Sequence, residues 1–309
     1  EREEEAGDGR AGSAAEGDRI LMGGKVSGIF DAHIHIQPWE QMKPQVLATM
    51  KKGHRDFEVL MDYSRSVDRF LRYLDQEEIE RAVLVNYVSP DLMGFSDSVN
   101  SYIADYCRGH ADRLVAMGSV HPRFTQDPAG DVERIAQMGV RALKLHPPHQ
   151  LFHPNDYRTG TLPALESIYR KAAELKLPVM FHTGTSIFPG ARNVYGDPIT
   201  IDDVAVDFPE LTIVLAHGGR PLWGNTAFFL VRRFPNVYMD ISGIPPRSVL
   251  KMFPRLEEIS HKVLFGSDWP GPAVPAISRN VAEIESLPLS ETAMKRVLRD
   301  NALAVYQVA

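Results

Sequence analysis

Short runs of apolar residues recur along the chain from residue 28 onward. Eight of them can be distinguished: GIFDAHIHI, RAVLVNYV, RLVAMGSV, VRALKLHP, LPVMFHTG, LTIVLAHGG, NVYMDISG and KVLFGSDW. Most are nearly continuous in Val, Ile, Leu, Phe and Ala and do not alternate with polar residues. Strands that are buried on both faces of a parallel sheet have this pattern. The chain is therefore predicted to contain a buried parallel sheet.

Helix-like segments lie between the predicted strands. Four of them are SDSVNSYIADYCRGH, DPAGDVERIAQMG, TLPALESIYRKAAELK and TAFFLVRRFP, and LSETAMKRVLRDNALAVYQ is expected to form a closing amphipathic helix. Strands that alternate with helices over this length predict a (β/α)8 TIM barrel, which typically has about 250 residues. A doubly wound open sheet is the main alternative, but no Gly-rich phosphate loop follows the first strand.

Two segments depart from this alternation. About 45 residues separate the first predicted strand from Arg81, which is far more than a strand-to-helix connection needs, so we expect a helical insertion over the barrel mouth as a candidate lid. Residues 1–24 combine charge, Gly and Ala with few large apolar side chains, so a flexible acidic tail is expected there. The predicted organisation is this tail followed by one barrel domain at residues 25–309.

Composition narrows the classes of function. The chain has 309 residues, with 34 Lys and Arg against 40 Asp and Glu and a net charge of -6, which argues against nucleic acid as a partner. Cys107 is the only cysteine, so an intrachain disulfide and a cysteine-rich metal site are excluded. We recognise neither a membrane-spanning apolar run nor a secretory signal. A cytoplasmic location without membrane attachment is expected, and a homo-oligomer stays open.

Polar residues stand at the ends of several predicted strands, where the active site of a (β/α)8 barrel lies. His33 and His35 share one face of the first strand, because alternate residues of a strand point the same way. The fifth, sixth and eighth runs end at His182, His217 and Asp268. Imidazole and carboxylate are the usual ligands of zinc, manganese and iron. One HxH pair alone is weak evidence for a metal site. Histidine or aspartate at the ends of four separate strands, the first, fifth, sixth and eighth, together indicates one.

Five short phrases strengthen this interpretation: FDAHIHI, LKLHPP, MFHTG, LAHGG and LFGSDWP. They resemble the amidohydrolase superfamily, and specifically amidohydrolase family 2, a group of metal-dependent barrels that includes aminocarboxymuconate semialdehyde decarboxylase and several lactone hydrolases. The resemblance covers residues 28 to about 306. It implies that four residues are the metal ligands: His33, His35, His182 and Asp268. His217 would be either a further ligand or a group that faces the substrate.

The resemblance also implies a reaction. The expected activity is hydrolysis of a small carbonyl compound, such as an amide, a lactone or a conjugated carboxylate, by a metal-activated water. Zinc is the first candidate for the ion, with manganese and iron as alternatives, and the ion would lower the pKa of bound water toward about 7. Asp268 would accept the proton of this water, and His217 would polarise the carbonyl.

Two other functions stay open at this point. Decarboxylating relatives use the same kind of site, so nonoxidative decarboxylation of an aromatic or muconate-type acid is the alternative activity. The third hypothesis is a catalytically inactive barrel that serves as a binding protein. The complete set of polar strand ends argues against it, because a scaffold has no need of those residues.

Lys144 stands in the fourth predicted strand. Binuclear members of the superfamily carry a carbamylated lysine there, which bridges two metal ions. A lysine in an apolar strand is costly to bury unpaired, so the other interpretation is an ion pair with Asp31 or Asp240. We favour the ion pair, because members of family 2 usually look mononuclear. Asp31 itself is expected to be a buried structural carboxylate.

The loops after the fifth and sixth predicted strands offer substrate contacts. The candidates are Arg192, Tyr195, Arg220 and Trp223. Arginine presents a planar fork that suits a carboxylate, and Trp or Tyr can cover a flat ring. A small, carboxylated substrate is therefore expected. His146, His149 and His153 lie near Pro-rich turns and are expected to be structural or rim residues.

Overall fold

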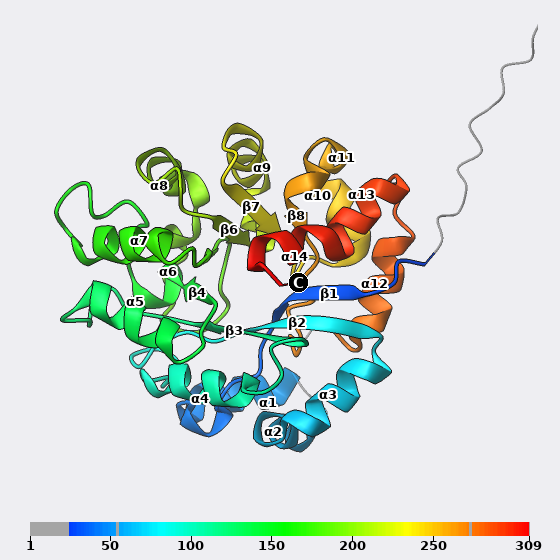
Figure 1. Ribbon diagram of the computed structural model, residues 1–309, viewed down its shortest axis with the longest axis horizontal. Coiled ribbons are helices and arrows are strands. Elements are labelled where there is room, and N and C mark those ends of the chain that lie inside the picture. The colour runs from blue at the N-terminus through cyan, green and yellow to red at the C-terminus, as the bar shows by residue number, and fades with distance from the viewer. Residues whose placement is uncertain (1–24, 54–55, 272–273, 309) are drawn as a thin grey trace, which may run out of the picture.

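The computed structural model describes residues 25–308 except 54–55 and 272–273, and these residues form a (β/α)8 TIM barrel (Figure 1). The strands are β1 (Ile29–Ile34), β2 (Ile79–Val85), β3 (Leu114–Gly118), β4 (Ala142–Leu145), β5 (Val179–His182), β6 (Ile213–Ala216), β7 (Val237–Asp240) and β8 (Val263–Leu264). Each strand pairs in parallel with the next. The Ala32 N–H donates to the Phe265 carbonyl and joins the last strand to the first. Each of the eight predicted runs overlaps one strand, so the predicted fold is confirmed.

Helices surround the barrel (Figure 1). The four predicted between strands are α4 (Ser98–Cys107), α5 (Pro128–Gln137), α7 (Ala164–Glu174) and α9 (Gly224–Arg233). Five further helices are α6 (Pro147–Gln150), α8 (Ile201–Asp207), α10 (Val249–Met252), α11 (Leu256–Ile259) and α12 (Ile277–Glu285). Short 3-10 turns are η1 (Trp39–Gln41), η2 (Asn193–Gly196), η3 (Pro198–Thr200), η4 (His217–Gly219), η5 (Pro246–Ser248) and η6 (Ser260–Lys262). Local side-chain chemistry determines where a helix starts. At α5, for example, the Asp127 side chain accepts a hydrogen bond from the Gly130 N–H and caps the N-terminus of the helix.

The predicted insertion between β1 and β2 is helical. It consists of η1, α1 (Pro44–Gly53), α2 (Phe57–Arg65) and α3 (Val67–Gln76). Phe70 and Leu74 bury the inner face of α3, and the hydroxyls of Tyr102 and Tyr106 in α4 donate to the carbonyls of Ser64 and Tyr63. The insertion is therefore packed against the barrel's helical ring, next to α4 (Figure 1).

The predicted closing helix is interrupted. α13 (Glu291–Lys295) leads into a π-helical turn at Arg296–Asp300 and then into α14 (Asn301–Tyr306). Ala302, Val305 and Tyr306 belong to the same apolar cluster as the barrel interior, and the rings of Phe30 and Tyr306 lie 6.1 Å apart. Phe30 is near the start of β1, so α14 covers the end of the barrel at which the strands begin (Figure 1).

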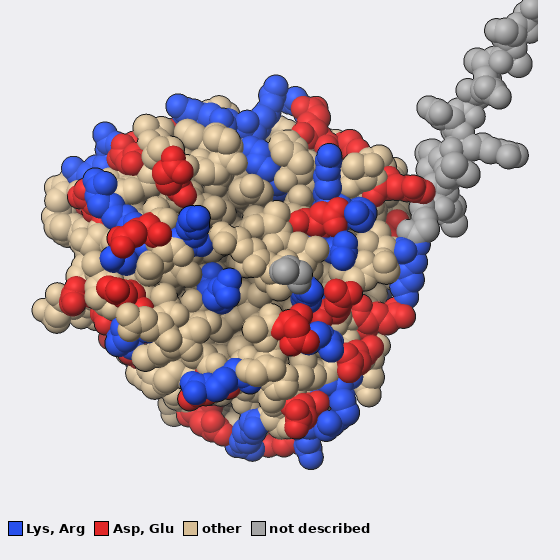
Figure 2. Space-filling view, in the orientation of Figure 1, with Lys and Arg blue, Asp and Glu red and all other residues tan. Residues whose placement is uncertain are grey.

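The face that carries α14 has acidic and basic side chains interspersed over it (Figure 2). Within the part of the chain that the structure describes, no helix has both the length and the apolar character that a bilayer span requires. The acidic tail predicted at residues 1–24 lies outside the described residues.

Candidate active site

A cavity of about 310 Å³ lies at the end of the barrel where the strands finish. Six sequence-predicted site residues line it: His35, Lys144, His182, His217, Arg220 and Asp268. Trp39, Met42 and Met50 of the insertion also line it, so the insertion covers the mouth as expected. Whether it opens and closes as a lid stays a prediction. The cavity thus combines polar strand ends with an apolar cover.

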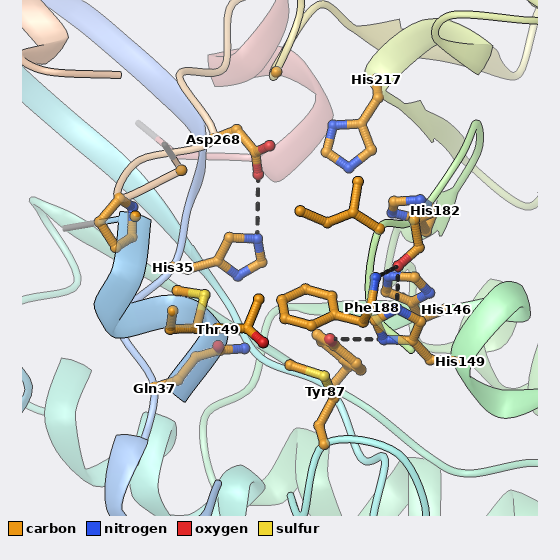
Figure 3. Close-up of a pocket in the computed structure, with 18 of the residues that line it drawn as sticks. His35, Gln37, Thr49, Tyr87, His146, His149, His182, Phe188, His217 and Asp268 are labelled. Carbon is orange, nitrogen blue, oxygen red and sulfur yellow. Dashed lines mark hydrogen bonds and ion pairs between the residues drawn. The ribbon is translucent and has the colours of Figure 1, made fainter. Parts of the chain in front are cut away.

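Three predicted residues meet most closely. His33, His217 and Asp268 each offer a ligand atom, and these atoms all lie within 4.8 Å of one another. The Nε2 atoms of His33 and His35 are 3.7 and 3.4 Å from Asp268 Oδ1, and Figure 3 shows His35 pointing toward this carboxylate. The ring of His182 lies 4.7 Å from that of His217. The structure therefore brings together every residue that the sequence predicts around the metal.

Asp240, at the end of β7, holds this cluster from behind. Its Oδ2 accepts from His33 Nδ1 at 2.9 Å, and its Oδ1 accepts from the backbone N–H groups of His217 and Ser242. Because His33 Nδ1 donates its proton, Nε2 carries the free lone pair. A carboxylate on the second nitrogen commonly orients a metal-binding histidine. Sequence reasoning missed this role for Asp240, although the seventh predicted strand also ends in a polar residue.

His217 is fixed in a similar way. Its Nδ1 lies 3.1 Å from the Ser242 carbonyl oxygen, which can only accept, so Nδ1 carries the proton and Nε2 a lone pair. Burial lowers the pKa of His217 well below its ordinary value and keeps the ring neutral. His217 therefore presents an acceptor to the cavity. This fits the expected ligand role better than the expected role as a donor to a substrate carbonyl.

The backbone is strained at two of these residues. His217 and Asp268 have φ values of 67° and 66°, in the left-handed region, which costs a residue with a Cβ roughly 1–2 kcal/mol. Strain of this kind accumulates at functional sites, where the surrounding structure enforces it. Here it turns both side chains toward the same cavity.

The charge states suit a cation. Burial lowers the pKa of His33 to about 4 and that of His182 well below its ordinary value, so both rings are neutral. Burial acts to raise the pKa of Asp268, but its contacts with His35, His33 and Arg220 outweigh burial and hold that pKa below its usual range. His33 Nε2 and His182 Nε2 are buried without a hydrogen-bond partner among the described residues. Two neutral imidazoles whose Nε2 atoms lack such partners, one of them beside the Asp268 carboxylate, fit a divalent metal ion.

Lys144 departs from the expectation. Its side chain is buried, but Nζ has no hydrogen-bond partner and no ion pair within the described part of the chain. The favoured pairing with Asp31 or Asp240 is therefore wrong. Asp31 is instead held by the backbone N–H groups of His33 and Ser267, and burial raises its pKa to about 7. Burial lowers the pKa of Lys144 to about 8, although the charges of Asp240 and Asp268 oppose this shift.

Arg220 is the predicted arginine that reaches the cavity. One of its terminal nitrogens lies 3.2 Å from Asp268 Oδ2, and the other donates to the Thr185 carbonyl. Gly243 makes room for it: a Cβ at that position would lie 2.5 Å from Arg220 Nε. A larger residue there would displace the guanidinium from Asp268.

The other predicted loop contacts lie elsewhere in the structure. Arg192, Tyr195 and Trp223 are not among the described residues that line the cavity. The Arg192 N–H donates to the Pro148 carbonyl, and the Tyr195 ring lies 4.6 Å from that of His153. Trp223 immediately precedes α9. Their contact with substrate stays a prediction.

The cavity also contains residues that sequence reasoning placed at the rim or left out. His146 and His149 line it, together with Tyr87. The His146 ring stacks on those of His149 and His182, with centroids 3.6 and 3.9 Å apart (Figure 3). The available signal was the position of His146 directly after the fourth strand, with His149 one helical turn later.

Comparison with known proteins places this chain in a family. The sequence profile described as amidohydrolase matches residues 30–308. The chain belongs to the amidohydrolase family. No functionally curated protein is detectably similar to it in sequence. The resemblance noted from the strand-end phrases is therefore confirmed.

Solved structures with the same fold are similar to this amidohydrolase over most of its length. An uncharacterised TIM-barrel protein from Bordetella bronchiseptica is 21% identical with a TM-score of 0.71, over 90% of this chain and 99% of its own. A probable 2-pyrone-4,6-dicarboxylic acid hydrolase from Acinetobacter baumannii, with citric acid bound, is 16% identical with a TM-score of 0.62, over 91% and 99%. A 5-carboxyvanillate decarboxylase from Novosphingobium aromaticivorans, with bound manganese and a nitrobenzoic acid, is 16% identical with a TM-score of 0.63, over 92% and 97%. At these identities the likeness shows the fold.

Proposed function

We propose that this amidohydrolase is a metal-dependent hydrolase of a small, carboxylated carbonyl compound, such as an amide, a lactone or a conjugated carboxylate. One observation carries the proposal: within the described part of the chain, His33 Nε2 and His182 Nε2 are buried without hydrogen-bond partners, and His33 Nε2 lies 3.7 Å from a carboxylate oxygen of Asp268. Buried polar atoms without partners are rare in folded proteins. A metal ion in this position would satisfy both nitrogens.

The proposed ligands are His33, His35, His182 and Asp268, and the acceptor on His217 makes it a further candidate. Zinc is the first choice for the ion, and manganese and iron are the alternatives. When bound, such an ion supplies Lewis acidity, which polarises a carbonyl oxygen and makes water acidic enough to ionise near neutral pH.

The chain's own residues supply the remaining steps. Asp268 is ionised because its pKa is held low, so it accepts the proton of the attacking water and passes it to the leaving group. The guanidinium of Arg220 beside it binds the substrate carboxylate. Trp39, Met42 and Met50 cover the cavity, and they keep bulk water away from the reacting atoms.

A nonoxidative decarboxylase of an aromatic or muconate-type acid is the second candidate. Two similar structures favour it, because they are described as a 5-carboxyvanillate decarboxylase and a 2,6-dihydroxybenzoate decarboxylase. Phe188 also lines the cavity, as do Trp39, Met42 and Met50 of the insertion, and these apolar side chains suit a flat ring that carries one carboxylate.

The deciding experiment combines metal analysis with a substrate screen. Purified protein should contain about one transition-metal ion per chain, and a chelator should remove both the ion and the activity. Lactones, amides and carboxylated rings are then screened in parallel for acid release and for carbon dioxide release. Acid release that returns on addition of zinc or manganese supports the proposal. Carbon dioxide release would replace hydrolysis by decarboxylation, and full turnover without metal would refute both.

Lys144 decides the number of ions. We propose that it is an unmodified lysine in a mononuclear site, because the negative charges of Asp240 and Asp268 favour a cationic amine there over an anionic carbamate. After equilibration with ¹³C-bicarbonate, the ¹³C NMR spectrum should contain no carbamate carbon. A carbamate signal that disappears in Lys144→Met would show a binuclear site instead.

A further inference from the structure

Three polar side chains form a hydrogen-bonded row on the other side of the cavity from Asp268. The hydroxyl of Tyr87 lies 3.0 Å from His149 Nδ1, and Ser186 Oγ lies 2.7 Å from His149 Nε2. Figure 3 shows the contact between Tyr87 and His149. The three residues follow β2, lie in α6 and follow β5, and all of them line the cavity. The fold therefore assembles this row from three separate segments.

The direction of the row follows from Tyr87. Its side chain is buried, and His149 Nδ1 is the hydrogen-bond partner of its hydroxyl within the described residues. A buried hydroxyl must donate its proton to an acceptor, so Tyr87 donates and Nδ1 accepts. Burial keeps the His149 ring neutral, and a neutral imidazole with an accepting Nδ1 carries its proton on Nε2.

The proton on Nε2 fixes the role of Ser186. His149 Nε2–H donates to Ser186 Oγ, and the backbone N–H of Phe188 donates to the same oxygen at 3.3 Å. A hydroxyl oxygen has two lone pairs and one proton. Both lone pairs are then engaged, and the Ser186 proton is left to donate.

The loop around Ser186 holds the hydroxyl in place. The Asn193 side chain accepts from the Ser186 N–H at 2.8 Å and donates to the Ser186 carbonyl. The Gly184 N–H donates to the Gly196 carbonyl, which ties the two ends of the loop together. The donor therefore needs little reorganisation before it binds a ligand.

We propose that the Ser186 O–H is a fixed donor that binds an acceptor oxygen of the substrate, a carboxylate or carbonyl oxygen, and that Tyr87 and His149 are its positioning residues. The inference rests on the proposed function only in taking this cavity as the substrate site. It adds a second polar anchor, across the cavity from Arg220 and Asp268. Ser186 is thereby a specificity-determining residue, because a substrate without an acceptor at this position would leave the donor unpaired.

The first test reads the direction of the row directly. Long-range ¹H–¹⁵N NMR spectra of the full, ¹⁵N-histidine-labelled chain distinguish a proton on Nε2 from one on Nδ1, and His149→Gln identifies the His149 signals by their loss. We expect the Nε2–H form in the wild type and a mixture of both forms in Tyr87→Phe. A proton on Nδ1 in the wild type would overturn the proposal, because Ser186 would then donate to His149.

The second test measures ligand binding by calorimetry, with benzoate as the anionic probe and toluene as the probe without an acceptor. A hydrogen bond to a charged group is worth about 1.5–3 kcal/mol, which corresponds to roughly a ten- to hundredfold weaker benzoate affinity in Ser186→Ala. Toluene binding should not change. Ser101→Ala is the matched control, because it deletes an exposed hydroxyl on α4.

The outcomes separate this inference from the proposed function. Equal benzoate affinities in the wild type and Ser186→Ala would overturn the Ser186 proposal, even if the metal and turnover tests succeed. Failure of the wild type to bind benzoate, with His149 in the Nε2–H form, would count against a carboxylated substrate and would support the direction of the row.

Discussion

The cavity has histidines on two sides, and their ring nitrogens are engaged differently. On the side that we call the ligand wall, Nδ1 of His33, His35 and His217 contacts Asp240, the Val85 carbonyl and the Ser242 carbonyl. Each Nε2 can then carry the lone pair, and those of His33 and His35 lie 3.7 and 3.4 Å from Asp268 Oδ1. On the opposite side, the imidazole stack consists of His146, His149 and His182, whose rings lie face to face. Both nitrogens of His149 have protein partners there.

The comparison teaches that the second nitrogen decides what a histidine can do. A ring whose Nδ1 is tied to an acceptor keeps a lone pair on Nε2 for a metal, whereas a ring bonded at both nitrogens can only position its neighbours. His182 belongs to the stack by its ring and to the proposed ligand set by its Nε2, which has no hydrogen-bond partner among the described residues. It marks the boundary between the two sides.

The largest expected effect removes the ligand wall. The double variant His33→Ala, His35→Ala should lose the bound ion and all turnover, because two of the four proposed ligands are absent. His149→Gln, in the imidazole stack, should keep one ion per chain. Metal content by mass spectrometry, with circular dichroism to check the fold, measures both. A double variant with its full metal content would show that the ligand assignment is wrong.

Asp268 provides the next largest effect. Asp268→Asn should fold normally and lose roughly 10²–10⁴ in kcat, since an amide cannot take a proton from water. Steady-state kinetics on the best substrate from the screen measures this loss. Asp105→Asn, an exposed residue on α4, is the matched control. Near-normal kcat in Asp268→Asn would remove this residue from proton transfer.

Arg220 should have a smaller effect that depends on substrate charge. Arg220→Met should lower kcat/KM roughly ten- to hundredfold for a carboxylated substrate and far less for its neutral amide, because it removes one charged hydrogen bond. Arg192→Met tests the second predicted arginine in the same assay. The exposed Arg247, which pairs with Glu283, gives the control Arg247→Met. Equal losses on charged and neutral substrates would mean that Arg220 only supports the loop and Asp268.

The smallest effect is on stability, and both sides of the cavity contribute to it. Burial lowers the pKa of His33 from 6.5 to about 4 and that of His149 to about 3. Below pH 6.5 the unfolded chain therefore binds more protons than the folded chain, and stability falls as the pH drops toward 4.

Each such histidine contributes at most about 1.4 kcal/mol per pH unit in this range. Urea unfolding of metal-free protein at several pH values between 6.5 and 4 measures the slope, and His149→Gln should make it shallower. A slope that is the same in both proteins would argue that His149 is not held neutral by the fold.

Much of the fold and of the ligand wall was predictable from the sequence because both depend on local pattern. Continuous apolar runs mark the strands, and the period of two places His33 and His35 on one face. His217 directly follows β6 and Asp268 follows β8 after a short connection, at the end of the barrel where the active site is expected. These features require no knowledge of loop conformation.

The remainder depends on contacts between distant segments. Asp240 accepts hydrogen bonds from His33 of β1 and from the backbone N–H of His217 after β6. A carboxylate at the end of a strand does not indicate in the sequence which histidine it will contact. Lys144 was expected to pair, but the nearby carboxylates are occupied by backbone N–H groups and by His33. Arg192 and Tyr195 follow a loop whose path is set by hydrogen bonds to Pro148 and Asn193, and such a path leaves no periodic signal.

The contact between Phe30 and Tyr306 has a consequence for synthesis on the ribosome. β1 emerges early in translation, whereas α14 emerges after all eight strands. This helix covers the end of the barrel at which the strands begin. Until then the apolar interior of the barrel is open at that end, and exposed interiors of incomplete chains are prone to aggregate. A nascent chain stalled before residue 301 should therefore be a client of cellular chaperones, even though all eight strands and the histidines of the cavity have already been made.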